Sequence, residues 1–239
     1  MRLISLILLF LLSGTVSAQK VEWYTTTQTS PWVKQKVKPE RTTTGAEIVL
    51  DPAQRLQLIT GIGGCFNEMG WDALNALSAE DREAVLQAIF GKDGACFDYC
   101  RLPMGANDFA MSFYSSADVA GDFNLVNFNI DRDRYILIPY IKAARQINPD
   151  LRIWASPWCP PPWMKTNNHY ASAVRPSGEK DVNGLLPHEA IAEFSTGFRM
   201  EEGYLKTYAD YFARFIKAYE GENEIHHNGT GEKGTKKSE

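Results

Sequence analysis

The sequence predicts an α/β fold, a partial (β/α)₈ TIM barrel with about the first three of its strand–helix units. Short apolar runs typical of buried strands each lead into a segment with helical periodicity. Such repeats favour a parallel sheet with helices outside it. Polar or aromatic residues follow each run, and in a barrel these positions converge on one face. A doubly wound sheet would also bind ligands there, but the glycines at 61–64 lack the G-x-G-x-x-G spacing of a dinucleotide site.

Residues 1–18 have the pattern of a secretory signal peptide. Arg2 precedes an apolar stretch at 3–12, and the small residues Val16-Ser17-Ala18 form a cleavage site. The apolar stretch is short for a membrane span. We therefore expect cleavage near Ala18, no integral membrane segment afterwards, and a secreted or periplasmic protein.

Residues 19–50 are polar, rich in threonine and interspersed with aromatic side chains. They predict an extended, peripheral segment that ends in a short strand at 46–50. The barrel portion is expected to follow over residues 51–220.

The first barrel unit is expected to begin with a strand at 57–61 and a tight glycine passage. Helices are predicted at 69–77 and 79–90, and Ser78 with Asp81 three residues later resembles a capping box for the second helix.

The second unit is predicted to have a strand at 97–102, a long loop that carries Asn107 and Asp108, and a helix from a capping Asp131 to Ile147. Apolar residues of this helix fall on one stripe: Ile136, Leu137, Tyr140, Ile141, Ala144 and Ile147.

The third unit is predicted to have a strand at 151–156 and, later, an amphipathic helix at 201–219. The loop after the strand contains four prolines in six positions, which makes it stiff. Trp158 and Trp163 on this loop are suited to line a pocket in which an indole packs on a sugar ring. The alternative is that the cluster only plugs one end of the domain, and for Trp163 packing is favoured.

Composition restricts the possible partners and cofactors. The net charge is −4 with both signs mixed, which argues against a nucleic-acid partner. The four cysteines permit disulfides but are interpreted as buried free thiols. No metal-ligand spacing is present around the histidines, which are expected to face solvent.

Three motifs occur in order: GIGGCFNE at 61–68, RLPMGANDF at 101–109, and ASPW at 155–158 with WMKT at 163–166. Together they resemble the first three strands and following loops of glycoside hydrolase family 30, the glucosylceramidase-like enzymes. The resemblance covers residues 51–219. It implies a retaining β-glycosidase that needs no cofactor and acts on a carbohydrate or glycolipid, with a small side β-sandwich to which residues 19–50 would contribute.

The resemblance also implies roles for three residues. Asp108 would hydrogen-bond sugar hydroxyls, Trp158 would form one wall of the sugar pocket, and Arg101 would orient the catalytic carboxylates. From the residues alone, Arg101 could instead be a buried ion-pair partner, and Asp108 could cap nearby backbone amides. Glu68 is the last residue of the first motif, and we assign it no role from the resemblance.

The chain departs from the family after Tyr219. The two catalytic glutamates of the resembled family lie near its fourth and seventh strands, and neither strand is recognisable here. Residues 221–239 are polar and predicted to be disordered. Asn223-Glu224 is not interpreted as catalytic, because it lies a few residues past a helix with no intervening strand to place the carboxylate at the barrel mouth. We therefore expect this chain to be inactive alone and its last strand to have an unpaired edge. The alternatives are a non-catalytic carbohydrate-binding remnant and the product of a frameshifted gene; the oligomeric state is left open.

Overall fold

The computed structural model describes residues 21–38, 51, 53–176 and 183–222. Its contacts divide the chain into two compact units, Met1–Leu56 and Gln57–Glu239, which are described in turn. The expected signal peptide, the strand at 46–50 and the tail beyond Glu222 lie outside the described residues.

The first unit contains a small antiparallel strand pair. Strands β1 (Trp23–Thr25) and β2 (Val33–Gln35) pair with Trp23 opposite Gln35. The rings of Tyr24 and Trp32 stack with their centroids 5.4 Å apart. This strand pair fits the extended structure expected for residues 19–50, and its membership of a side β-sandwich stays a prediction.

The second unit is built on two parallel strands, β3 (Tyr99–Met104) and β4 (Arg152–Pro157), with Arg101 opposite Trp154. These lie within two residues of the strands expected at 97–102 and 151–156. A parallel pair joined through a helical connection is the arrangement that the strand–helix repeat predicts.

The prediction of a strand at 57–61 is wrong. Those residues are irregular, and the backbone pairs with β3 farther along, through Arg101 N–H to the Gly64 carbonyl (2.8 Å) and Phe66 N–H to the Arg101 carbonyl (2.9 Å). Between this described segment and β3 the one bridge is that of Cys65, which pairs in parallel with Arg101. The glycine passage therefore takes the place of the first strand. A Cβ atom at Gly63 would collide with the Tyr99 carbonyl, so only glycine permits this approach.

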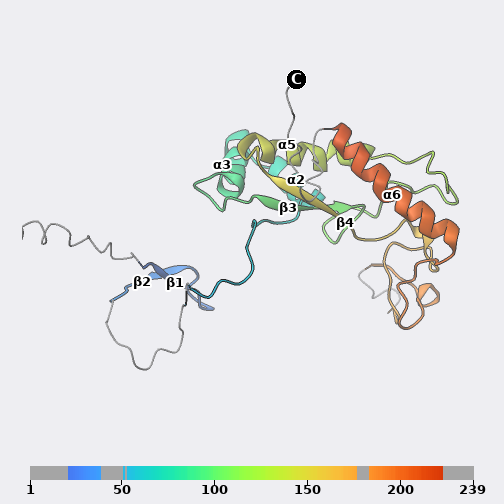
Figure 1. The fold of residues 1–239 in the computed structure, drawn as a ribbon, viewed down its shortest axis with the longest axis horizontal. Coiled ribbons are helices and arrows are strands. Elements are labelled where there is room, and N and C mark those ends of the chain that lie inside the picture. The colour runs from blue at the N-terminus through green and yellow to red at the C-terminus, as the bar shows by residue number, and fades with distance from the viewer. Residues whose placement is uncertain (1–20, 39–50, 52, 177–182, 223–239) are drawn as a thin grey trace, which may run out of the picture. The chain divides into compact units, whose positions relative to one another are not determined.

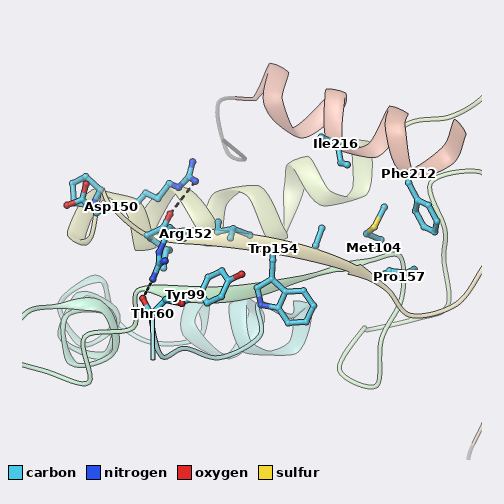
Figure 2. Close-up of a pocket in the computed structure, with 14 residues that line it drawn as sticks. Thr60, Tyr99, Met104, Asp150, Arg152, Trp154, Pro157, Phe212 and Ile216 are labelled. Carbon is cyan, nitrogen blue, oxygen red and sulfur yellow. Dashed lines mark hydrogen bonds between the residues drawn. The ribbon is translucent and has the colours of Figure 1, made fainter. Parts of the chain in front are cut away.

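Helices follow each of the three parallel segments. They are α2 (Glu68–Asn75) and α3 (Ala79–Phe90), then α4 (Asp131–Tyr135) and α5 (Leu137–Ile147), then α6 (Glu202–Gly221). Short 3₁₀ turns lie at Pro162–Met164 and Pro187–Glu189. Figures 1 and 2 both show α5 and α6 on one side of the β3–β4 pair.

The single helix expected from Asp131 to Ile147 is two helices. They meet at Ile136, whose φ of −123° and ψ of −65° depart from helical geometry. Pro139 explains the break, because it has no N–H to donate to the Tyr135 carbonyl and its ring would clash with that carbonyl. Asp131 is the first residue of α4 rather than its cap, and Ile130 before it provides no side-chain cap.

The buried core joins α2, α3, α5 and α6 to the strands of this unit. Tyr211, Phe215 and Tyr219 of α6 are fully buried, as are Leu137, Ile141 and Ala144 of α5. The same cluster includes Leu102 of β3 and Phe66 after the glycine passage. The apolar stripes expected on the second- and third-unit helices are thus confirmed for α5 and α6.

The cap expected at the start of α3 is confirmed. Ser78 Oγ accepts a hydrogen bond from Asp81 N–H (3.0 Å) and donates one to Asp81 Oδ2 (2.8 Å). We expect Ser78→Ala to lower the free energy of unfolding by about 1 kcal/mol, since an amide of the first turn loses its acceptor. Urea unfolding measures this, with Ser78→Thr as the control that keeps a hydroxyl. Equal stability of the two variants would contradict the assignment.

Asp133 is a buried carboxyl group that joins three parts of this unit. It is 1% exposed and accepts hydrogen bonds from the hydroxyls of Tyr114 (2.9 Å) and Tyr219 (2.6 Å). Burial raises its pKa from the ordinary 3.8 to about 6, although both tyrosine bonds act in the opposite direction.

The raised pKa makes stability depend on pH with a defined sign. Between about pH 4 and pH 6 the folded chain binds this proton more tightly than the unfolded chain, so stability falls as pH rises through this range. At 1.36 kcal/mol per pKa unit, the loss is about 3 kcal/mol. Urea unfolding of the wild type and Asp133→Asn at pH 4 and pH 7 checks it: the difference between the two proteins should change with pH. A pH-independent difference would show that Asp133 has an ordinary pKa.

Two smaller expectations need correction, those for the cysteines and for the histidines. All four cysteines are free as expected, but Cys65 and Cys96 are exposed and only Cys100 is fully buried. Cys96 follows the turn after α3 and has a positive φ of 51°. His169 is half-buried rather than solvent-facing, and its Nδ1 accepts the Ala171 N–H.

Candidate functional site

A cleft of about 1000 Å³ lies where β3 and β4 end. Its walls come from the loop after β3, the Pro/Trp loop after β4, and the start of α6. Among its lining residues are Asn107 and Asp108 from the first loop, Trp158 and Lys165 from the second, and Leu205 and Tyr208 from α6. The carboxyl ends of neighbouring parallel strands thus meet at one site, as the sequence predicts.

Asp108 reaches this cleft because the chain turns sharply after β3. Gly105 has a φ of +81°, a conformation that side chains with a Cβ rarely adopt. Asn107 Oδ1 accepts the Phe109 N–H (2.9 Å) and so performs the capping considered for Asp108. The Asp108 side chain is exposed, and among the residues that the structure describes it has no hydrogen-bond partner. Its carboxylate is available to a ligand.

Trp158 and Arg101 are in direct contact beside the cleft. The Arg101 guanidinium carbon lies 4.8 Å from the centroid of the Trp158 ring and 5.4 Å from that of Trp154. Arg101 Nε donates to Ser156 Oγ (2.6 Å), the residue opposite Pro103 on β4. No carboxylate pairs with Arg101 within the described ranges, so the buried ion-pair interpretation is not supported.

Trp158 itself lines the cleft with 39% of its surface exposed. The structure therefore brings together all three residues singled out from the sequence. Asp108 and Trp158 lie on two walls of the same cleft, and Arg101 is in contact with the Trp158 indole.

Lys165 is a cleft residue that sequence reasoning missed, although it stands in the WMKT motif. The residue is 2% exposed, and Nζ donates to the carbonyls of Tyr170 (2.6 Å) and Ala171 (3.1 Å). Burial lowers the pKa of this amine. The Tyr170 ring stacks on Phe113 at 5.2 Å, so Lys165 holds an aromatic wall of the cleft in place.

Trp163 is a packing residue rather than part of the cleft, which confirms the interpretation favoured from the sequence. The side chain is 8% exposed, and its Nε1 donates to the Ala117 carbonyl (2.9 Å). The Phe123 ring meets it edge to face at 5.2 Å. The Pro/Trp loop therefore supplies one indole to the cleft, and the other fixes the loop to the core.

A second cleft, of about 790 Å³, runs along the free edge of β4. Figure 2 shows Arg152 and Trp154 projecting from β4 in this cleft, with Phe212 and Ile216 of α6 above the strand. In the described part of the chain β4 pairs only with β3, so the unpaired edge expected from the sequence is present. This cleft follows the side of a strand rather than strand ends, and we do not assign the sugar to it.

No group of three His, Cys, Asp or Glu side chains in the described residues is arranged to hold a metal ion. No described helix is both long and apolar enough to cross a membrane.

Parallel strands, helices that follow each strand and a polar–aromatic cleft at the strand ends define part of an α/β barrel. The model of the glycosyl hydrolase family 30 TIM-barrel domain matches residues 59–235. The chain belongs to this family.

Known proteins of this family resemble the chain over part of their length. Putative glucosylceramidase 4 of Caenorhabditis elegans is 30% identical over 210 residues, which are 86% of this chain and 37% of that protein. Lysosomal acid glucosylceramidase of Mus musculus is 29% identical, with 77% and 32% covered. The solved structure of an endo-β1,6-glucanase superposes with a TM-score of 0.55 at 26% identity, over 74% of this chain and 35% of that one. The chain thus spans about a third of the length of these relatives.

Proposed function

We propose that the chain forms the sugar-binding part of a retaining β-glycosidase that acts on β-glucosidic bonds. The observation that carries this proposal is the shared cleft of Asp108 and Trp158 at the ends of β3 and β4. An indole face packs on the C–H face of a sugar ring, and a free carboxylate accepts hydrogen bonds from its hydroxyls. Arg101, in contact with Trp158, would favour the ionised form of carboxylates placed beside it.

We further propose that the 239-residue chain binds glucosides without hydrolysing them. A retaining glycosidase uses two carboxyl groups about 5 Å apart, one as acid/base and one as nucleophile. Among the described residues that line the cleft, Asp108 is the sole carboxylate, and its implied role is to bind hydroxyls. Binding without turnover is also what a non-catalytic carbohydrate-binding remnant would show, so this alternative remains.

The rim of the cleft favours a glycolipid over a glucan. Phe109, Met111 and Phe113 alternate along the loop after β3, with 58%, 55% and 48% of their surfaces exposed. Met111 and Phe113 line the cleft directly. An apolar rim suits an alkyl aglycone, whereas a second glucose unit needs polar partners for its hydroxyls.

Calorimetric titration of the full chain tests these proposals together. We expect octyl β-glucoside, below its micelle concentration, to bind more tightly than the β-1,6-linked disaccharide of glucose, and a sensitive assay to detect no released glucose. Tighter binding of the disaccharide would favour a β-glucan substrate. Absence of binding to either ligand would leave a nonfunctional product of a frameshifted gene as the better account.

The remaining proposals concern the chain's first residues. We propose that residues 1–18 direct export to the periplasm or medium and that residues 19–50 belong to a side β-domain. The strand pair β1–β2 supports the second statement. N-terminal sequencing of the exported protein should begin at Gln19; a product that starts at Met1 would contradict cleavage.

A further inference from the structure

Glu68 is a buried carboxylate beside the cleft that the proposed function does not use. It is the first residue of α2 and is 2% exposed. Arg132 of α4 binds both of its oxygens, through Nε to Oε1 (2.6 Å) and Nη2 to Oε2 (2.7 Å). Such a two-point contact fixes the relative orientation of the two side chains.

The pair also holds the loop that carries Asp108. The Met111 N–H donates to Glu68 Oε2 (2.7 Å), and Arg132 Nη1 donates to Ser112 Oγ (2.8 Å). The guanidinium carbon of Arg132 lies 4.2 Å from the centroid of the Tyr114 ring. Contacts from two helices therefore reach three positions in four consecutive loop residues.

One more hydrogen bond ties the same loop to α2. Met69 N–H of α2 donates to the carbonyl of Phe109 (3.0 Å), the residue directly after Asp108. Neither Glu68 nor Arg132 lines the cleft, whereas Asp108, Met111, Ser112 and Phe113 all do. The ion pair thus stands behind the wall that faces the ligand.

We propose that Glu68 and Arg132 are positioning residues, which hold the 107–114 loop so that Asp108 faces the sugar. This inference rests on the proposed function, since it gives the pair its purpose through Asp108. Without the pair the loop keeps its cleft residues but loses three contacts, those at Met111, Ser112 and Tyr114.

The test uses the full chain with Glu68→Gln and, as a matched control, Glu80→Gln at an exposed position of α3. Both carboxylate oxygens of Glu68 face N–H donors, so an amide NH₂ in either place sets donor against donor. We expect exchange of the Met111 amide to accelerate about tenfold or more and the Kd for octyl β-glucoside to rise about tenfold, as for loss of a hydrogen bond to a charged group. Glu80→Gln should match the wild type in both.

A merely structural role is separated by two further variants. If Glu68 acts through Asp108, Glu68→Gln should weaken binding no further in a chain that already carries Asp108→Ala. Arg132→Lys keeps the charge but not the two-point contact and should give an intermediate Kd; it also carries the test if Glu68→Gln does not fold.

The outcomes distinguish this inference from the proposed function. Unchanged Met111 exchange and unchanged binding in Glu68→Gln would overturn the positioning role while leaving the sugar site intact. If the wild type binds no glucoside, the proposed function is wrong, and faster Met111 exchange would then support only the holding of the loop. Equal additional weakening by Glu68→Gln with and without Asp108 would show that the pair does not act through that carboxylate.

Discussion

Trp158→Ala should raise the Kd for octyl β-glucoside about 10- to 100-fold. The indole is the aromatic surface that the Pro/Trp loop presents to the cleft, with 39% of it exposed to a ligand. Burial of a large apolar side chain contributes about 1.5–3 kcal/mol, so its removal should weaken the binding free energy by about this amount, which corresponds roughly to the stated change in Kd. Isothermal titration of the full chain measures it.

Trp154→Ala is the matched control. This indole is 44% exposed and also lies against Arg101, but it lines the cleft along the edge of β4. We expect its Kd to stay within about twofold of the wild type, because surface changes outside a binding site have small effects. Greater weakening by Trp154→Ala than by Trp158→Ala would place the sugar in the edge cleft.

Asp133→Ala should destabilise the fold more than any other single change considered. The carboxylate accepts hydrogen bonds from two tyrosine hydroxyls, that of Tyr114 in the loop after β3 and that of Tyr219 in α6. Its loss leaves two buried hydroxyls without their acceptor, each at a cost of about 1–3 kcal/mol. We therefore expect a loss of about 3 kcal/mol at pH 7, measured by urea unfolding.

Asp133→Asn is the control for this variant. The amide keeps one acceptor oxygen for a tyrosine hydroxyl, so the loss should be smaller than in Asp133→Ala. The neutral amide also avoids the burial of a charge, which raises the pKa of the native carboxyl. Equal destabilisation by both variants would mean that the hydrogen bonds contribute little.

The sequence predicted those parts of the fold whose pattern is local. β3 and β4 are apolar runs, α3 begins at a recognisable cap and α6 has an apolar stripe, so the bounds predicted for each agree with the structure within two residues. The glycine passage failed because pairing of a glycine-rich segment depends on its neighbour: Gly63 fits against Tyr99, which is distant in sequence. The break at Ile136 is predictable from Pro139, because a proline ring inside a helix clashes with the carbonyl of the preceding turn.

The candidate site was partly predictable for the same reason. Trp158 directly follows β4 and Asp108 lies in the loop after β3, so the convergence of strand ends brings them to one cleft. Glu68 could not be assigned, because its partners Met111 and Arg132 are 43 and 64 residues away along the chain. A buried ion pair of this kind has no local sequence pattern.

The central claim is that the ends of β3 and β4 build a sugar-binding cleft. A crystal structure of the full chain soaked with octyl β-glucoside tests it most directly. We predict the glucose ring against the Trp158 indole, with a hydroxyl within hydrogen-bond distance of the Asp108 carboxylate. A sugar found instead along the edge of β4, between Trp154 and Phe212, would contradict the account.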